Sequence, residues 1–330
     1  MSSSAFGEFG RIDRYFKPLA KDFPGALGLT DDAAVFAVPD GFELVVTTDA
    51  MVAGVHFFPE DPPEDIAAKL LRVNLSDLAA MGAEPLGYSL VTALPKGLGE
   101  GWLAAFVRGL GEDQERYRFP LIGGDSVSTP GPVMLSVTAF GTVPRGRAMT
   151  RGGARAGDRV FATGAIGDAA LGLLIAQDRL EGGDEVDRAH LLGRLRRPEP
   201  RLPLAAALRG VATAAVDVSD GLVADLGHIA EVSGLTAVVE AGRVPFSPAA
   251  LRVLERQPDL WSMLLTMGDD YELAFTVPAD RREAVWALAA QARTPVAEIG
   301  RMESGPAGTV TVLGADGAPM TFKGRGWEHF

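Results

Sequence analysis

Cysteine is absent from this chain of 330 residues. Without thiols the protein cannot form disulfide bridges, zinc ribbons, iron–sulfur clusters or a cysteine nucleophile. The histidines are also few and scattered, which excludes a His-Glu-x-x-His zinc helix; they are His56, His190, His228 and His329. The absence of disulfides fits a reducing compartment, so we expect a cytoplasmic protein.

The chain contains fewer basic than acidic residues. The 31 Lys and Arg residues are outnumbered by 43 Asp and Glu residues, and the net charge is −12. Nucleic acids and anionic membrane surfaces attract clustered Lys and Arg, so we expect neither as a partner. If the ligand of such an acidic protein is itself an anion, metal cations are expected to lie between the ligand and the protein.

Several standard motifs are missing as well. The chain has no Gly-x-x-x-x-Gly-Lys-Ser/Thr phosphate loop, no Gly-x-Gly-x-x-Gly after a strand and no Gly-x-Ser-x-Gly. Residues 1–16 have neither a basic region nor an unbroken apolar core, so we expect no signal peptide. The charge-free run Ser126–Pro144 is broken by Pro130 and Pro132, and we expect no membrane span there.

Short β-branched runs alternate with helical patterns along the chain, which predicts a mixed α/β (α+β) protein. A Gly- and Arg-rich stretch, Pro144–Asp158, interrupts this alternation. We therefore predict two domains, residues 1–148 and residues 149–330. The predicted strands are Glu43–Thr48, Leu86–Leu94, Phe119–Gly123, Pro132–Val143, Arg159–Thr163, Ala214–Val218 and Tyr271–Val277. The predicted helices are Glu64–Met81, Gly101–Tyr117, Asp168–Gln177, Leu222–Val232 and Arg281–Arg293.

Aspartates recur where the predicted strands and helices end. Asp49 closes one strand, Asp125 follows two glycines that allow a ligand to approach the backbone, and Asp217 and Asp220 flank Ser219. Further aspartates of this kind are Asp31, Asp32, Asp77, Asp269 and Asp270. Carboxylates and hydroxyls are hard oxygen ligands that suit Mg²⁺, which in turn binds phosphate oxygens. The alternative is that these aspartates only form turns, cap helices or lie in solvated loops.

The sequence resembles the thiamine-monophosphate kinases of the aminoimidazole ribonucleotide synthetase superfamily. Nine sequence segments carry the resemblance in the same order as in that family and span Gly7 to Phe330. They are GEFGRIDRYF, TDDAAV, TTDAMVAGVHF, NLSDLAAMGAEP, LIGGDS, RAMTRGGARAGD, VDVSDGLVADLGHI, GDDYELAFTVP and GWEHF.

The resemblance implies an aminoimidazole ribonucleotide synthetase-like fold of two α/β domains. In the expected arrangement, residues 1–148 bind ATP and Mg²⁺ and pair their sheet with that of a partner in a homodimer. Residues 149–330 are expected to complete the active-site cleft. The implied reaction transfers a phosphoryl group from ATP to thiamine monophosphate, giving thiamine diphosphate, with two or more Mg²⁺ ions.

The resemblance also implies roles for individual residues. The implied Mg²⁺ ligands are Asp32, Thr47, Thr48, Asp49, Asp77, Asp125, Asp217 and Asp220, with Asp31 adjacent to them. The implied ATP contacts are Gly124, Asp125, Arg151 and Ser219, and Asp49, Asp125 and Asp220 are the implied catalytic residues. The implied substrate contacts are His56, Asp269 and a C-terminal aromatic residue, either Phe322 or Trp327.

The chain departs from the family at two places. Thr30 stands where the family has Gly before the two aspartates, and Asp269 stands where it has Glu. Two alternatives to the kinase remain: another ATP-dependent enzyme of the same superfamily, and a non-catalytic ATP-binding module. Selenophosphate synthetase and the hydrogenase-maturation dehydratase depend on Cys or selenocysteine, which this chain lacks.

Overall fold

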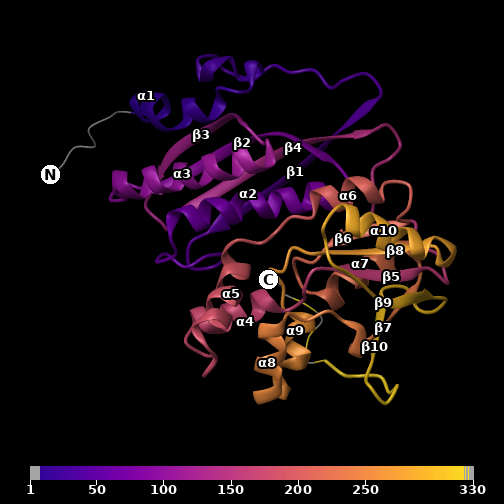
Figure 1. The fold of residues 1–330 in the computed structure, drawn as a ribbon. Helices are drawn as coiled ribbons and strands as arrows, with labels where there is room; N and C mark the ends of the chain where they lie inside the picture. Colours follow the sequence, from indigo (N-terminus) through magenta and orange to yellow (C-terminus); the bar gives the residue numbers. More distant parts are fainter. Residues whose placement is uncertain (1–7, 323, 325, 327–330) are drawn as a thin grey trace. The chain divides into compact units, whose positions relative to one another are not determined.

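The computed structural model of the chain describes residues 8–322, 324 and 326. The chain divides into two compact units (Figure 1). The first unit consists of Met1–Leu78 and Glu84–Gly146, and the second of Ala79–Ala83 and Arg147–Phe330. Each unit has its own sheet and core, and the two are described separately.

The first unit is built on a four-stranded sheet. Its strands are β1 (Phe42–Val52), β2 (Glu84–Pro95), β3 (Leu121–Thr129) and β4 (Met134–Pro144), in the order β1-β4-β2-β3. β4 pairs antiparallel with β1 and β2, whereas β2 and β3 are parallel. The helices α2 (Pro63–Ala80) and α3 (Glu100–Tyr117) connect the strands.

One face of this sheet is covered by helices. Along β4 the residues alternate between buried and half-buried, as expected for a strand with one covered face. On β2, the buried Tyr88 donates a hydrogen bond to the Oε1 of Gln114 in α3. The opposite face carries partly exposed side chains, including Leu44 and Val46 of β1.

Short helices precede the first strand. They are α1 (Glu8–Arg11), a π-helical turn at Ile12–Phe16 and 3₁₀ turns at Lys17–Ala20 and Pro24–Leu29. The chain then runs without regular structure to β1. The ring of Phe36 in this stretch meets the ring of Phe140 of β4 edge to face at 5.7 Å. The N-terminal segment therefore covers part of the sheet face that α2 and α3 leave open.

The second unit contains a six-stranded sheet with the order β10-β7-β9-β5-β8-β6. The strands are β5 (Arg159–Thr163), β6 (Ala214–Asp217), β7 (Thr236–Glu240), β8 (Leu273–Val277), β9 (Val296–Glu303) and β10 (Thr309–Leu313). β10 and β7 are parallel, and the other neighbours pair antiparallel.

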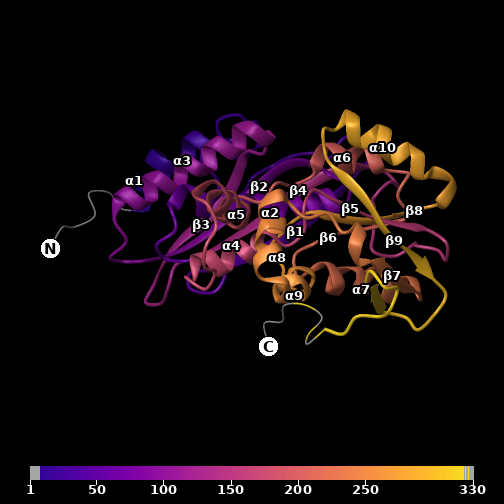
Figure 2. The same cartoon turned by 60° about the horizontal axis from the view of Figure 1, so that its bottom comes forward.

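Helices pack on both faces of this sheet (Figure 2). On β5, Val160 and Ala162 join the core beneath α7 (Leu222–Ser233). Phe161, between them, joins the core beneath α6 (Leu202–Leu208) and α10 (Arg282–Gln291). A third core lies among helices that flank the sheet, namely α4 (Asp168–Ala176), α5 (Glu185–Arg196), α8 (Pro248–Arg256) and α9 (Trp261–Thr266).

The twelve predicted elements are all present, with ends that differ by a few residues. Two strands run well beyond their predicted ends, β1 to Val52 and β3 to Thr129. Asp49 and Asp125 therefore lie within strands, and the prediction that each closes a strand is wrong. Among the described residues, eight α-helices and strands were not predicted, namely α1, α5, α6, α8, α9, β7, β9 and β10.

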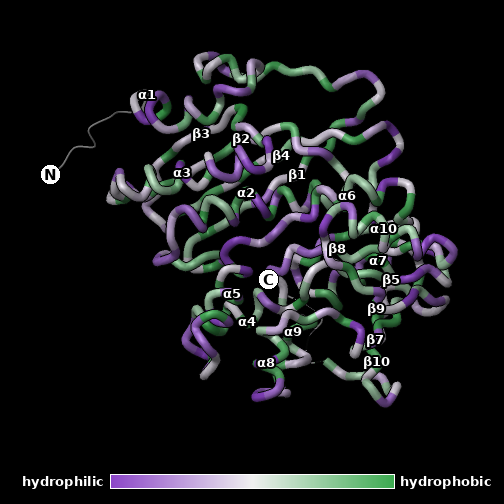
Figure 3. The backbone as a smooth tube through the Cα atoms, in the orientation of Figure 1, coloured by the Kyte–Doolittle hydropathy of each residue, from purple (hydrophilic) through white to green (hydrophobic). Residues whose placement is uncertain are grey.

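No helix in the described part of the chain combines the length and the apolar character needed to cross a membrane. Hydrophobic and hydrophilic stretches alternate throughout both units (Figure 3).

Candidate functional site

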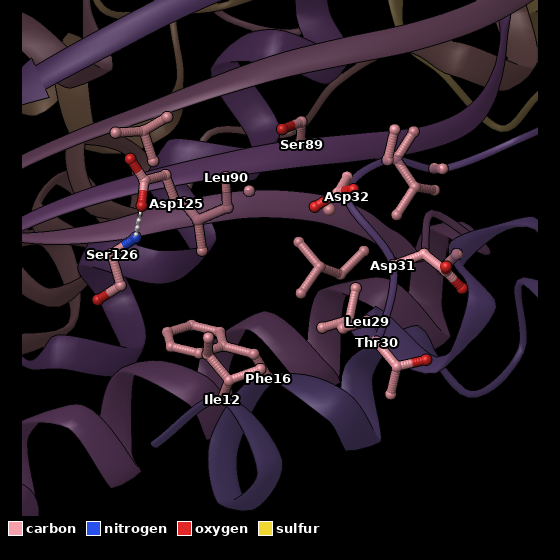
Figure 4. Close-up of a pocket in the computed structure, with 18 of the residues that line it drawn as sticks. Ile12, Phe16, Leu29, Thr30, Asp31, Asp32, Ser89, Leu90, Asp125 and Ser126 are labelled. Carbon is pink, nitrogen blue, oxygen red and sulfur yellow. Dashed lines mark hydrogen bonds between the residues drawn. The ribbon is translucent and has the colours of Figure 1, made fainter. Parts of the chain in front are cut away.

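A cavity of about 720 Å³ opens between the N-terminal segment and the sheet of the first unit. Asp32 and Asp125 both line it, on different sides, with Ile12 and Phe16 forming an apolar wall (Figure 4). Asp31 also belongs to the lining, but its side chain is directed away from Asp125 (Figure 4). The structure thus brings together carboxylates that are more than ninety residues apart in the sequence.

Gly124 lets β2 and β3 approach closely beside Asp125. It has a φ of 155°, and a Cβ at this position would lie 1.9 Å from the carbonyl oxygen of Leu90 on β2. Any side chain at residue 124 would therefore push the two strands apart. The Asp125 side chain is exposed and accepts a hydrogen bond from the backbone N–H of Ser126 at 2.8 Å.

A second polar group lies between β1 and α2. The Thr47 hydroxyl donates to Oδ2 of Asp77 at 2.5 Å, and the Asp49 backbone N–H donates to Oδ1 of Asn74 at 3.2 Å. Asn74 is fully buried, and its side-chain amide donates in turn to the carbonyl of Leu70. Asn74 and Asp77 are three residues apart and both face β1, so they project from one face of α2.

Thr48 lies apart from this second group. Successive side chains of a strand point to opposite faces, so Thr48 does not share the face of Thr47 and Asp49. Its hydroxyl donates to the Thr138 hydroxyl at 3.0 Å. The structure therefore divides the three consecutive predicted ligands between the two faces of β1.

His56 follows β1 and is half-buried. Its Nδ1 accepts a hydrogen bond from the backbone N–H of Val52 at 3.1 Å. Because Nδ1 acts as an acceptor, the proton of the neutral ring is on Nε2. His56 therefore presents an N–H donor at its Nε2.

In the second unit, two predicted site segments lie side by side. The segment after β6 runs along the segment before β8: Val218 N–H donates to the Glu272 carbonyl at 2.7 Å, and Asp269 N–H donates to the Ser219 carbonyl at 2.9 Å. Gly268 fits tightly here, since a Cβ on it would lie 1.7 Å from the Ser219 oxygen. The segments that carry Ser219 and Asp269 therefore form one rigid pair.

The three acidic residues around Tyr271 have different surroundings. Asp269 is half-buried, whereas Asp270 and Glu272 are buried. Glu272 accepts hydrogen bonds from the Thr163 hydroxyl and from the guanidinium groups of Arg194 and Arg201. Asp269 is therefore the least buried acid of this motif.

One further cluster surrounds Asp220. It consists of Asp220, Asp225 and His228, each of which offers one ligand atom within 4.8 Å of those of the other two. Among the described residues, no other three His, Asp or Glu side chains come this close together. Asp225 is buried, and its Oδ2 accepts the backbone N–H groups of Asp220 and Gly221 at 3.1 Å each. Burial raises the pKa of Asp225 to about 7, and the neighbouring Asp220 adds to the rise.

Most donors in these groups suit Mg²⁺. They are mainly carboxylate and hydroxyl oxygens, which hard divalent cations prefer, and a thiolate is not available. The groups that could contribute ligands to such an ion are the carboxylates of Asp32 and Asp125 on different sides of the cavity, the pair Thr47 and Asp77, and the carboxylate of Asp220. Asp217 is buried at the end of β6, where it faces Leu273 across the sheet.

Two family models match the chain. The N-terminal domain of "AIR synthase related protein" matches residues 30–143, and its C-terminal domain matches residues 155–313. Two curated thiamine-monophosphate kinases are similar over nearly the full length. The protein from Caulobacter vibrioides is 43% identical over 98% of this chain and 90% of its own length. The protein from Salmonella typhimurium is 42% identical over 99% of both chains.

The chain belongs to the thiamine-monophosphate kinase family. Solved structures of thiamine-monophosphate kinases have the same fold. The structure from Stenotrophomonas maltophilia superposes with a TM-score of 0.84 at 43% identity, covering 94% of this chain and 97% of that one. A structure described as AaThiL complexed with AMPPCP and TMP gives a TM-score of 0.78 at 31% identity, covering 100% of this chain and 99% of that one. The two-domain aminoimidazole ribonucleotide synthetase-like fold expected from the sequence is thus confirmed.

The last three predicted residues are Arg151, Phe322 and Trp327. Arg151 is exposed, and its positive charge partly offsets the rise in the pKa of Asp225. Its backbone carbonyl accepts a hydrogen bond from the Ser233 hydroxyl at 3.5 Å. Phe322 is half-buried and packs against the core beneath α7. Trp327 lies outside the described residues.

Sequence reasoning overlooked the supporting residues of this thiamine-monophosphate kinase family member. Asn74 entered only as part of the segment that contains Asp77, and Asp225 was not singled out. A signal for Asp225 was available, because a carboxylate five residues after Asp220 and four after Gly221 can accept the free N–H groups at the start of α7. Both Asn74 and Asp225 accept a backbone N–H group, of Asp49 and of Asp220 and Gly221 respectively, and such contacts depend on the folded backbone.

Proposed function

We propose that the protein phosphorylates thiamine monophosphate with ATP and Mg²⁺, by direct in-line transfer, to give thiamine diphosphate. The observation that carries this proposal is the 42% identity to a curated thiamine-monophosphate kinase over 99% of both chains. The AaThiL structure supports the substrate pair, because it holds AMPPCP, a non-hydrolysable analogue of ATP, together with TMP.

In this proposal the first unit binds Mg²⁺ and the phosphates. Asp32 and Asp125 line one cavity, and Thr47, Asp49 and Asp77 surround the end of α2. The chain has a net charge of −12, so its carboxylates repel the phosphates of ATP. Cations are therefore needed between the phosphates and these carboxylates. When bound, two or more Mg²⁺ ions neutralise the charge that develops on the transferred group.

The remaining roles fall to single residues. Gly124 keeps the backbone beside Asp125 free of side-chain atoms, which allows a phosphate to approach. In the second unit, Asp217 and Asp220 serve as further Mg²⁺ ligands, and Ser219 and Arg151 contact ATP. Thr48 is kept as a proposed Mg²⁺ ligand, but it lies on the face of β1 opposite to that of Asp49. Asp49, Asp125 and Asp220 are the catalytic residues.

His56 and Asp269 contact thiamine monophosphate in this scheme. His56 offers an N–H donor at Nε2, which matches the acceptor oxygens of a phosphate. Asp269 offers a carboxylate, which matches an amino group such as that of the aminopyrimidine. The acceptor of the phosphoryl group is itself a phosphate oxygen and is largely deprotonated near neutral pH, so the transfer requires no general base.

We also propose a homodimer and a cytoplasmic location. The face of the first unit's sheet that lacks helices exposes Leu44, Val46 and Val127, of which Val46 is 52% exposed. A sheet face with exposed apolar side chains is suited to pairing with the same face of a second copy. Light scattering of the purified protein tests the dimer, and a monomeric mass at micromolar concentration would contradict it.

The direct test of the function is incubation of the purified protein with ATP, Mg²⁺ and thiamine monophosphate. Thiamine diphosphate should appear with equimolar ADP, and chelation of Mg²⁺ should abolish both products. ADP release without thiamine diphosphate would favour another ATP-dependent enzyme of the superfamily. ATP binding without any ADP would favour a non-catalytic ATP-binding module.

A further inference from the structure

The buried carboxylate of Asp270 joins two parts of the second unit that are about a hundred residues apart in the sequence. It accepts the backbone N–H of Gly167 at 2.8 Å and that of Ala169 at 3.3 Å. These groups belong to the start of α4, where free N–H groups need acceptors. The N-cap residue of α4 is Gly167, which has no side chain, so Asp270 takes over the capping.

Asp270 also lies between two strained residues. Asp269 has a φ of 69° and Tyr271 a φ of 50°, which is left-handed backbone that residues with a Cβ rarely adopt. Such a conformation persists only where the surroundings hold it. Two backbone hydrogen bonds contribute: Asp269 N–H donates to the Ser219 carbonyl, and Tyr271 N–H to the Val218 carbonyl at 2.8 Å. The Asp270 carboxylate between them ties the same segment to the start of α4.

We propose that Asp270 is a positioning residue for thiamine monophosphate, which holds Asp269 in the conformation that contacts the substrate. The proposal rests on the role of Asp269 in the proposed function. The Ser219 segment has separate support, because Asp225 accepts the N–H groups of the next two residues, Asp220 and Gly221. Loss of the Asp270 carboxylate should therefore disturb the binding of thiamine monophosphate much more than the binding of ATP.

The test is a comparison of steady-state kinetics for Asp270→Ala and Asp270→Asn. In Asp270→Ala we expect KM for thiamine monophosphate to rise about tenfold, with KM for ATP within about twofold of wild type. Asp270→Asn keeps one acceptor oxygen and should raise KM for thiamine monophosphate about threefold. If the alanine variant fails to fold, the asparagine variant decides the matter.

Asp158→Asn is the matched control. Asp158 is also buried, and it accepts the Arg155 backbone N–H at 2.9 Å and the Thr213 hydroxyl at 2.7 Å. Its replacement should lower Tm without changing KM for either substrate. If the Asp270 variants behave in the same way, with a lower Tm and unchanged KM values, Asp270 is only structural and the proposal is overturned.

A double-mutant cycle separates this proposal from the proposed function. If Asp270 acts through Asp269, KM for thiamine monophosphate in Asp269→Ala/Asp270→Ala should equal that in Asp269→Ala alone. If the increases in KM of the two single variants multiply in the double variant, Asp270 acts independently of Asp269. This result would refute the positioning role without contradicting the proposed kinase activity. A wild-type protein that makes no thiamine diphosphate would instead refute the proposed function itself.

Discussion

Replacement of Gly124 by alanine tests how closely β2 and β3 must approach beside Asp125. The Cβ of the alanine would lie 1.9 Å from the Leu90 carbonyl oxygen, and real Cβ contacts almost never fall below 3.0 Å. The strands must therefore separate locally by about 1 Å, and a displacement of this size at a catalytic group can reduce the rate roughly 100-fold. Overpacking of this kind costs about 1–3 kcal/mol of unfolding free energy.

The measurement combines steady-state kinetics with thermal unfolding. We expect Gly124→Ala to lose about two orders of magnitude in kcat and to unfold roughly 2–12 °C lower than wild type. Gly123→Ala is the control for stability, because a Cβ on Gly123 has no atom within 4 Å. Its Tm should stay within about 1 °C of wild type. A Gly124→Ala variant with wild-type kcat, or equal losses of Tm in both variants, would refute the reasoning.

Three further predictions concern the metal ligands, the course of the reaction and pH. Asp49→Asn should keep the fold, since the hydrogen bond to Asn74 comes from the backbone of residue 49. The variant should lower kcat at least about 100-fold, because an anionic Mg²⁺ ligand is lost. A wild-type kcat at saturating Mg²⁺ would exclude Asp49 as a ligand. The γ-phosphorus of chirally labelled ATP should invert once, because the transfer is direct; retention would reveal a covalent intermediate. Burial raises the pKa of Asp270 well above its usual value, so the folded state holds this proton more tightly than the unfolded chain does. Its contribution to stability is then complete below about pH 4 and is lost as the pH rises towards the pKa in the folded state. Tm of the Mg²⁺-free wild-type protein should therefore fall more steeply with rising pH than Tm of Asp270→Asn. Parallel curves of Tm against pH would contradict a raised pKa of Asp270 in the folded state.

The sequence was sufficient for the fold class and for most of the strands and helices that carry the proposed site. α2 was predicted because Ile66, Leu70, Val73 and Leu78 recur at helical spacing, and a pattern sustained over an 18-residue helix is a strong local signal. β6 and α7 were found because a short apolar run ends in an acidic turn before a second periodic stretch. The family was identified from complete motifs in a fixed order, which needs no structure.

The elements that the sequence did not reveal are short or weakly patterned. The five residues of β10, TVTVL, have the β-branched composition of a strand, but so short a run between loops becomes a strand by pairing with β7. Pairing between distant segments is a tertiary property, so no local pattern specifies it. The extension of β3 beyond Asp125 has the same origin, since Ser126–Thr129 pair with Thr92–Pro95 of β2.

The division of labour among the acidic residues was likewise decided by the tertiary structure. In the sequence, Asp269, Asp270 and Glu272 are three similar carboxylates in one motif. Folding places Asp270 at the start of α4 and Glu272 between Arg194 and Arg201, and leaves Asp269 half-buried. The sequence alone determines which carboxylates the chain has and to which family it belongs. What each carboxylate does depends on burial and on partners up to a hundred residues away, and these arise only when the chain has folded.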